Sequence, residues 1–345
     1  MRVLYSVSYD NNLNPFLKTL TDAIKRIDCD IHLGFGAELI WSDEVFHFDV
    51  LHIMWPEFLV DDRHSAYALK RRLSEIKKKG IHIVSTCHNI EPHYSCNKDK
   101  YNAIIYSYEL SDTIHHLGNY SLSVLKKCFP NVDHELIPHH IYDTLYTNTP
   151  SRKESCRYLG LSPKYNYILC LGAIRDIEEI EMLEYVAKKL RRGTKLIVPS
   201  LILNIGKRFD FRTRFNYYKY KFVTTHNRLI SNIGFVKDEI IPYYLAVSSI
   251  TLVQRLRILN SGNVPLGMFA GNVIIGPNIG NVGEILKNTG NFFFNKKEDI
   301  PGLIELASVA VKEGKGDMNR EYALSNWSSS FIAKCVLNSY KSLFV

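Results

Sequence analysis

The sequence predicts an α/β protein with two doubly wound domains, each a parallel sheet covered by helices. Its 345 residues exceed the size of one ordinary core and fit two. Short apolar runs alternate with amphipathic helical runs along most of the chain, which is typical of parallel sheets. This alternation stops over residues 142–165 and then begins again. We therefore expect a linker between two domains in that segment.

Composition indicates a folded protein without a membrane span. The chain is 46% hydrophobic and 23% charged, which excludes a disordered protein. Its net charge of +8 favours anionic partners such as nucleotides, phospholipid headgroups or nucleic acid, without selecting among them. The 7 cysteines are scattered and form no C-x-x-C motif. With no signal-peptide pattern and no long apolar run, we expect a reduced, cytoplasmic protein.

The periodicity gives an order of elements. In the first half we expect strands at 1–8, 49–54, 81–86, 113–117 and 135–137, with helices at 15–27, 66–79, 101–110 and 121–128. In the second half we expect strands at 167–171, 194–199, 230–234 and 250–253, helices at 178–190 and 238–246, and one long final helix at 319–343. Ligands of such sheets bind outside the carboxyl ends of the strands, so we expect a site in a cleft between the two domains.

The segment 261–284 carries the strongest indication of function. It reads as a turn, a short helix, a glycine break, a buried strand, a glycine-rich turn and a second helix. Helix starts present unpaired backbone N–H groups and the positive end of the helix dipole, both of which favour a phosphate. The segment therefore predicts a bound nucleotide.

Several motifs, taken in order, resemble those of the GT-B glycosyltransferases, specifically the nucleotide-sugar-dependent family 4. They cover nearly the whole chain and lie at 55–57 (WPE), 86–93 (TCHNIEPH), 137–139 (IPH), 169–175 (LCLGAIR), 234–246, 260–271 and 280–284 (GNVGE). Each motif is weak alone, and their order makes the set specific. The sequence departs from the family pattern in four places, one of which is the segment 11–14 (NNLN), where the family has a glycine pair. Leu259 and Gly267 stand where the family has two glutamates, and Glu178 stands where it has a lysine.

The resemblance implies a fold, an activity and a domain plan. It implies a GT-B fold with an acceptor-side domain over 1–145, a nucleotide-sugar domain over 160–320, and a C-terminal helix over 321–345 that returns toward the first domain. It implies transfer of a sugar from a UDP-sugar or GDP-sugar to a glycan or lipid-linked acceptor, in the synthesis of a bacterial capsule, exopolysaccharide or O-antigen. A retaining reaction without a metal or other cofactor is expected.

The predicted donor-binding residues follow strands of the second half. Arg175 matches the phosphate-binding arginine of the family, although an arginine there can also pair with nearby acids. The arginines at 255 and 257 are candidates for the positive charge missing at 178, and a solvated basic pair fits them equally well. The polar residues of 261–263 and the acid at 284 suit ligand contacts or simple helix capping. The predicted set is Arg175, Arg255, Arg257, Ser261, Gly262, Asn263, Asn281, Gly283 and Glu284.

The predicted catalytic residues follow strands of the first half. The resemblance places His88 beside the donor sugar, where it would stabilise the reacting centre. A metal site at His88 and His93 is the weaker reading, because no third ligand is evident. Glu57 and Glu91 are the carboxylates best placed to act as a general base on an acceptor hydroxyl, which an inverting enzyme needs and a retaining one does not.

A basic, aromatic stretch at 210–222 suits an anionic membrane surface or single-stranded nucleic acid, and equally a partly buried loop. The resemblance favours peripheral contact with the inner membrane, from the cytoplasmic side, over nucleic acid. The basic helix at 66–79 could extend that surface or be an ordinary solvated face. Two other functions stay open: a sugar-nucleotide epimerase of the same fold, and a non-catalytic protein that kept the fold.

Overall fold

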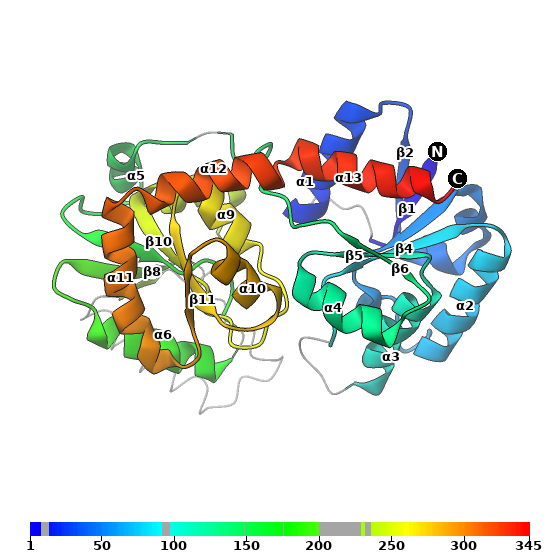
Figure 1. Cartoon of the computed structure of the whole chain (residues 1–345), viewed down its shortest axis with the longest axis horizontal. Helices are drawn as coiled ribbons and strands as arrows, with labels where there is room; N and C mark the ends of the chain where they lie inside the picture. Colours follow the sequence, from blue (N-terminus) through cyan, green and yellow to red (C-terminus); the bar gives the residue numbers. More distant parts are fainter. Residues whose placement is uncertain (8–13, 92–96, 148, 175, 200–228, 232–235) are drawn as a thin grey trace. The chain divides into compact units, whose positions relative to one another are not determined.

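The computed structural model describes residues 1–7, 14–91, 97–147, 149–174, 176–199, 229–231 and 236–345. These residues form two compact units (Figure 1). Unit 1 comprises Met1–Leu145 with Trp327–Val345, and unit 2 comprises Tyr146–Asn326. Each unit contains a six-stranded sheet in which all of the strand pairs are parallel. The predicted doubly wound α/β class is confirmed.

In unit 1 the strand order is β2-β1-β3-β4-β5-β6. The strands are β1 (Arg2–Tyr5), β2 (His32–Phe35), β3 (Val50–Ile53), β4 (His82–Cys87), β5 (Thr113–His116) and β6 (Asp133–Leu136). The helices are α1 (Pro15–Ile27), α2 (Ala66–Lys78), α3 (Lys98–Leu110), α4 (Asn119–Cys128) and α13 (Ser329–Ser342), with short 3-10 turns η1 (Glu38–Trp41), η2 (Asp43–His47) and η3 (Pro56–Phe58).

In unit 2 the strand order is β12-β11-β10-β7-β8-β9. The strands are β7 (Asn166–Leu169), β8 (Thr194–Val198), β9 (Leu229–Ser231), β10 (Ser248–Leu252), β11 (Val273–Pro277) and β12 (Phe292–Phe294). The helices are α5 (Arg152–Tyr158), α6 (Ile177–Lys189), α8 (Ile241–Val247), α9 (Asn263–Phe269), α10 (Gly280–Asn288), α11 (Ile300–Lys312) and α12 (Lys315–Trp327), with turns η4 (Asp238–Ile240) and η5 (Lys297–Asp299).

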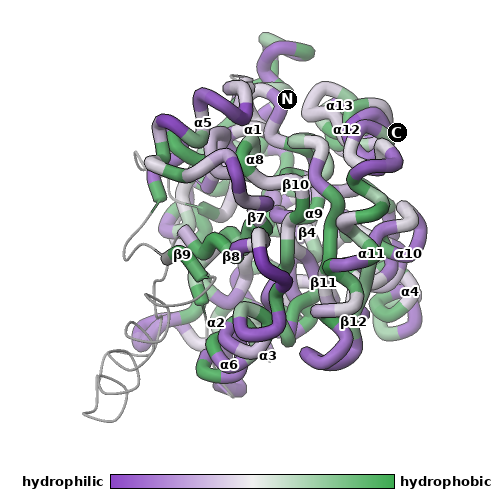
Figure 2. Tube along the Cα trace, turned by 90° about the vertical axis from the view of Figure 1, so that its left-hand side faces the viewer, coloured by the Kyte–Doolittle hydropathy of each residue, from purple (hydrophilic) through white to green (hydrophobic). Residues whose placement is uncertain are grey.

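The central strands are apolar because helices cover both of their faces. Every residue of β3 and of β11 is buried. The hydrophobic colour in Figure 2 accordingly runs along β11. Helix α1 shows how a covering helix is specified. Asn14 caps it by accepting a hydrogen bond from the Phe16 amide, Pro15 occupies the first turn, and its apolar face carries the buried Leu17, Leu20 and Ile24.

Two predicted segments are corrected, and three elements were not predicted. The expected linker at 142–165 contains α5, which begins at a capping box formed by Ser151 and Glu154 and packs against α8. The expected single helix at 319–343 is two helices, because Ser328 ends α12 and caps α13 by accepting from the Phe331 amide. The strands β2 and β12 and the helix α11 were not predicted. The basic, aromatic stretch at 210–222 lies outside the described residues.

The last two helices are fixed by buried polar groups. In unit 1, α13 packs against α1. The hydroxyl of Tyr340 lies 2.5 Å from His52 Nδ1 and 2.9 Å from the Tyr5 hydroxyl. In unit 2, Asn319 near the start of α12 donates from Nδ2 to the Asn272 carbonyl (2.8 Å) and to Asn291 Oδ1 (3.0 Å). Among the described residues, no helix is long and apolar enough to cross a membrane.

Candidate functional site

Polar groups of unit 2 converge at Gly172, three residues after the end of β7. Gly172 has a φ of +102°, a conformation that favours glycine. A Cβ atom placed there would have three nitrogens as its nearest neighbours: Asn263 Nδ2 at 3.6 Å, Arg255 Nη2 at 3.7 Å and Gln254 Nε2 at 4.0 Å. All three nitrogens carry N–H donors. The open side of Gly172 therefore suits an anionic oxygen.

A buried carboxylate holds Arg255 in this position. Nη1 of Arg255 donates to both carboxylate oxygens of Glu179, at 2.9 and 3.1 Å. The two side chains are only 12% and 2% exposed, so the pair is largely removed from water. Glu179 is placed by the start of α6, where the Asp176 side chain caps the helix through the Glu179 amide. The pair fixes one face of the guanidinium and leaves Nη2 beside Gly172.

Arg257 differs from Arg255, although both were predicted to contact the donor. Arg257 Nη2 donates to Glu178 at 2.8 Å, and these side chains are 77% and 58% exposed. This is an ordinary surface ion pair with little energetic weight. Of the two arginines, the structure brings Arg255 to Gly172. Arg175, the other predicted cation, lies outside the described residues.

The carboxamides of Gln254 and Asn263 complete this cluster. Asn263 Nδ2 donates to the Leu171 carbonyl at 2.6 Å, and Gln254 Nε2 donates to the Gly172 carbonyl at 3.4 Å. Gln254 is fully buried, and its Oε1 has no hydrogen-bond partner among the described residues. The sequence analysis missed Gln254, although a polar residue directly after the apolar strand at 250–253 is the pattern that marks such a site.

The predicted Ser261, Gly262 and Asn263 lie at the start of α9. Ser261 Oγ accepts from the Asn263 amide at 3.4 Å, and Gly262 is the N-cap residue with a helical conformation. Ser261 thus precedes the N-cap, which makes no side-chain capping hydrogen bond, and Asn263 is the residue of this turn whose side chain reaches Gly172.

The predicted residues of α10 are mainly occupied by packing. Asn281 is fully buried; its amide donates to the Leu259 carbonyl (2.9 Å) and its Nδ2 to Asn260 Oδ1 (2.6 Å). A Cβ at Gly283 would lie 2.8 Å from the Asn278 carbonyl carbon, so close packing requires the glycine. Glu284 is the fifth residue of α10, so it lies beyond the first turn, where an acid would compensate the helix dipole.

Gly267 stands where the resembled family has a glutamate, and the structure shows what surrounds it. Gly267 lies inside α9 and faces the sheet, where a Cβ would be 2.7 Å from Ile274 Cδ1 and 3.0 Å from Thr251 Oγ1. Packed side chains therefore fill this place.

In unit 1 the predicted His88 lies directly after β4, between two aromatic rings. The Trp55 ring stacks on the imidazole with centroids 4.6 Å apart at 23°. The Phe16 ring meets it edge-on at 5.0 Å and 85°. His88 and Trp55 follow neighbouring strands, β4 and β3, at the carboxyl edge of the sheet. The predicted functional histidine thus has a fixed orientation.

The two predicted glutamates of unit 1 have different environments. Glu57 is 5% exposed, and its Oε1 accepts from Asn89 Nδ2 at 2.8 Å. Burial raises the pKa of Glu57, and the Asn89 hydrogen bond opposes this shift. Glu91 is exposed and lies next to residues that are not described.

Two further histidines, His139 and His140, surround Phe16 and were missing from the predicted site set. Their rings lie 4.7 and 4.6 Å from the Phe16 ring. Burial lowers the pKa of both, so both are neutral near pH 7. The histidine pair follows β6, and this position after a strand was the available indication. Within the described chain, no group of three or more His, Cys, Asp or Glu side chains could hold a metal ion.

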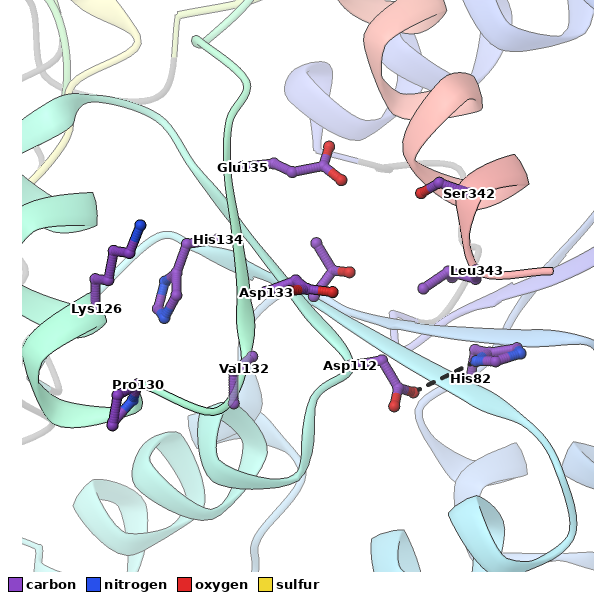
Figure 3. Close-up of a pocket in the computed structure, with 11 residues that line it drawn as sticks. His82, Asp112, Lys126, Pro130, Val132, Asp133, His134, Glu135, Ser342 and Leu343 are labelled. Atoms are coloured by element: carbon purple, nitrogen blue, oxygen red, sulfur yellow. Dashed lines mark ion pairs between the residues drawn. The ribbon is translucent and has the colours of Figure 1, made fainter. Parts of the chain in front are cut away.

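A separate pocket of about 580 Å³ lies at the opposite, amino end of the unit 1 strands (Figure 3). Its polar lining combines both signs of charge. Asp112 on its wall pairs with Lys77 (2.8 Å) and His82 (3.7 Å). Its lining residues are His82, Asp112, Thr113, Lys126, Pro130, Val132, Asp133, His134, Glu135, Ser342 and Leu343. None of the predicted site residues lies there.

Known proteins resemble this chain in structure and not in sequence. No protein-family model matches the sequence, and no curated protein sequence matches it. Solved structures do match. HepE (Alr3699) of Anabaena, in complex with UDP-glucose, aligns with a TM-score of 0.77 at 11% identity, over 99% of this chain and 100% of that one. Sucrose-phosphate synthase of Thermosynechococcus elongatus aligns at 0.76 with 12% identity, over 99% and 98%.

The chain has the GT-B fold. This confirms the architecture that the resemblance implied, and at such low identity the likeness establishes the fold alone. A protein described as a UDP-N-acetylglucosamine 2-epimerase from Listeria monocytogenes also matches, with a TM-score of 0.62 and 13% identity over 99% of this chain and 96% of that one.

Proposed function

We propose that this protein is a glycosyltransferase that uses a nucleoside-diphosphate sugar. The observation that carries the proposal is the convergence of Arg255, Asn263 and Gln254 on the open side of Gly172. Three N–H donors, one of them cationic and largely buried, suit a phosphate oxygen. The GT-B fold supports the proposal, since the matching HepE structure holds UDP-glucose.

In the proposed reaction, unit 2 stabilises the departing nucleoside diphosphate. Arg255 supplies positive charge and the two carboxamides supply hydrogen bonds, so charge that develops on the leaving group is met by groups already in place. We propose that Arg175 adds a second cation and that no metal is required. His88 of unit 1 is proposed to act on the donor sugar, because its imidazole is held rigidly at a sheet edge.

We further propose a retaining transfer to a glycan or lipid-linked acceptor in the synthesis of a surface polysaccharide. The burial of Glu57 makes one of the two candidate bases unsuitable, and a retaining reaction needs no general base on the acceptor. Incubation of the protein with UDP-glucose and candidate acceptors shows which acceptor receives the sugar. NMR of the product then gives the anomeric configuration of the new bond, which is the same as in the donor if the reaction is retaining.

Contact with the inner membrane from the cytoplasmic side is part of the proposal. The net charge of +8 and the exposed aromatic rings of Phe58 (71%) and Tyr67 (67%) support it. Helix α2 contributes less than its sequence indicates, because Lys70, Arg72 and Lys77 all form ion pairs. Co-flotation with anionic phospholipid vesicles, and not with neutral ones, is the expected result.

The central test is nucleotide binding by the whole protein. UDP, GDP, ADP and their sugars are compared by thermal shift and calorimetry, because a ligand of the native state raises the melting temperature. Stabilisation by one nucleotide is expected, and it identifies the donor base. If none of them binds, the proposal is wrong.

The similarity to an epimerase favours one alternative function. NMR of UDP-N-acetylglucosamine incubated with the protein distinguishes an epimerase from a glycosyltransferase, because an epimerase changes the configuration at C2 without an acceptor. A non-catalytic protein that kept the fold would leave every nucleotide sugar unchanged.

A further inference from the structure

The turn after β3 grips the residues after β4 at two points. Trp55 and Glu57 both belong to the turn at η3, which is closed by hydrogen bonds from the Phe58 amide to the Trp55 carbonyl (3.1 Å) and from the Leu59 amide to the Pro56 carbonyl (3.0 Å). The Trp55 ring lies flat on His88, and the Glu57 carboxylate accepts from Asn89. Two consecutive residues are thus held by one turn.

The backbone of Asn89 is fixed as firmly as its side chain. The Tyr108 hydroxyl donates to the Asn89 carbonyl at 2.6 Å, and Tyr108 is 1% exposed. Asn89 itself is 5% exposed, so both ends of the residue are bound away from water. The His88 amide donates to the Thr86 carbonyl at 2.9 Å. Little freedom remains for the chain that carries His88.

Glu57 is poorly placed to act as a base. A general base must come within about 2.6–3.2 Å of the proton that it removes. The side chain of Glu57 is buried, one oxygen is bound to Asn89, and the other is buried without a hydrogen-bond partner among the described residues.

We propose that the Trp55–Glu57 turn is a clamp that sets the orientation of the His88 imidazole, with Glu57 as a positioning residue that acts through Asn89. Trp55 fixes the plane of the imidazole, and the Glu57–Asn89 hydrogen bond fixes the backbone next to it. This inference rests on the proposed function, in which His88 acts on the donor sugar. It assigns Glu57 a role different from the general base expected from the sequence.

A conservative substitution separates the two roles. Glutamine at 57 keeps an oxygen that can accept from Asn89 Nδ2, whereas it removes all basicity. A positioning role therefore predicts that Glu57→Gln keeps most of the turnover of UDP-glucose, whereas Glu57→Ala loses about 10²-fold, the scale of a misplaced reacting group. The KM for UDP-glucose stays within about twofold in both, because nucleotide binding is proposed for unit 2. Glu135→Gln, at a half-buried glutamate on β6, is the matched control and retains full turnover.

Histidine NMR gives a readout that does not depend on turnover. With isotope-labelled histidine, the His88 resonances are assigned by comparison with His88→Gln. They should be sharp and unchanged in Glu57→Gln and in Glu135→Gln, and shifted or broadened in Glu57→Ala. Asn89→Ala should reproduce the effect of Glu57→Ala, and the double variant should add little, because the two residues form one contact.

These measurements decide whether Glu57 positions His88 or acts as a base. If Glu57→Gln loses as much turnover as Glu57→Ala while the His88 resonances stay in place, Glu57 is a base and the inference is wrong. Unchanged resonances in Glu57→Ala also overturn it. Failure of the proposed function looks different: the wild type then neither binds UDP nor consumes UDP-glucose, while the resonances still report whether Glu57 positions His88.

Discussion

The two units use different polar groups for comparable structural tasks. Twelve of the 13 histidines fall in the sequence range of unit 1, and the remaining one is His226 in the range of unit 2. Unit 1 fixes α13 through an imidazole and two phenols, whereas unit 2 fixes α12 through carboxamides. Carboxamides do not titrate and imidazoles do. Two units of the same architecture should therefore respond differently to pH.

The carboxyl edges of the two sheets differ in the same sense. In unit 1 the edge carries imidazoles packed among aromatic rings, and burial keeps two of them, His139 and His140, neutral near pH 7. In unit 2 the edge carries a guanidinium with carboxamides around a glycine. The second edge suits an anion and the first suits an uncharged partner. One fold thus presents two kinds of edge, and the following predictions test that difference.

The largest expected effect is loss of stability of unit 1 in acid. Burial lowers the pKa of His115 and His116 from 6.5 to about 3, so the folded unit keeps both neutral while the unfolded chain takes up protons below pH 6.5. Their contribution is complete above pH 6.5 and is lost as the pH falls toward 3. At pH 5 the loss is about 2 kcal/mol for each group.

Hydrogen exchange with mass spectrometry measures this for each unit separately. Between pH 7.5 and pH 5, after correction for intrinsic exchange rates, peptides of unit 1 should lose protection while those of unit 2 keep it. Earlier loss of protection in unit 2 would contradict the assignment of acid sensitivity to the buried histidines.

The next effect concerns the two arginines of unit 2. Arg255→Ala should weaken UDP binding about 30-fold, or about 2 kcal/mol, because it removes a charged hydrogen-bond donor from Gly172. Arg257→Ala should change the dissociation constant less than about twofold, because its ion pair is exposed. Calorimetry on both variants checks this. Equal losses in the two would show that burial is not what distinguishes the arginines.

Removal of an amide should destabilise unit 2 equally at every pH. Asn319→Ala leaves buried groups of Asn272 and Asn291 without their partner, at a cost of about 2 kcal/mol. Tyr340→Phe removes the hydroxyl that binds His52 in unit 1 and serves as the comparison. Urea unfolding at pH 7.5 and pH 5.5 should show a constant loss for Asn319→Ala, because carboxamides do not titrate. The loss for Tyr340→Phe should also be constant, because burial lowers the pKa of His52 well below 6.5 and keeps it neutral in the folded state at both pH values.

The smallest effect isolates the carboxylates behind the arginines. Glu179→Gln keeps the shape of the side chain but weakens its hold on Arg255, so UDP binding should fall about tenfold. Glu178→Gln, next to it in sequence and exposed, is the matched control and should have no measurable effect. If Glu178→Gln weakened UDP binding as much as Glu179→Gln, the phosphate site would have to be assigned to Arg257 instead of Arg255.

Helix bounds could be predicted where the residues that set them lie close together in the sequence. The bounds of α1 were found because Asn14, Pro15 and the apolar spacing all lie within a few residues of the helix. Ser151 and Glu154 form a capping box that was equally visible, but the lack of apolar periodicity around it led to a linker prediction. Ser328 breaks the last helix by capping the next one, which the continuous helical pattern concealed.

Contacts between distant segments account for what the sequence could not give. The sequence placed His88 and Arg255 after strands. It could not show that Trp55 stacks on His88, or that Glu179 rather than Glu178 binds Arg255, since each contact joins segments that follow different strands. The position of Gln254 after an apolar strand could be seen in the sequence, whereas the approach of its amide to Gly172 could not.

The packing around Gly267 limits which substitutions this position can accept. A glutamate there would have to enter the space now occupied by Ile274 Cδ1 and the Thr251 side chain. The charge would also face an apolar core, which is costly without a partner. A glutamate at 267 would therefore be easier to accommodate after smaller residues had replaced Thr251 and Ile274, so its cost depends on the order in which these positions change.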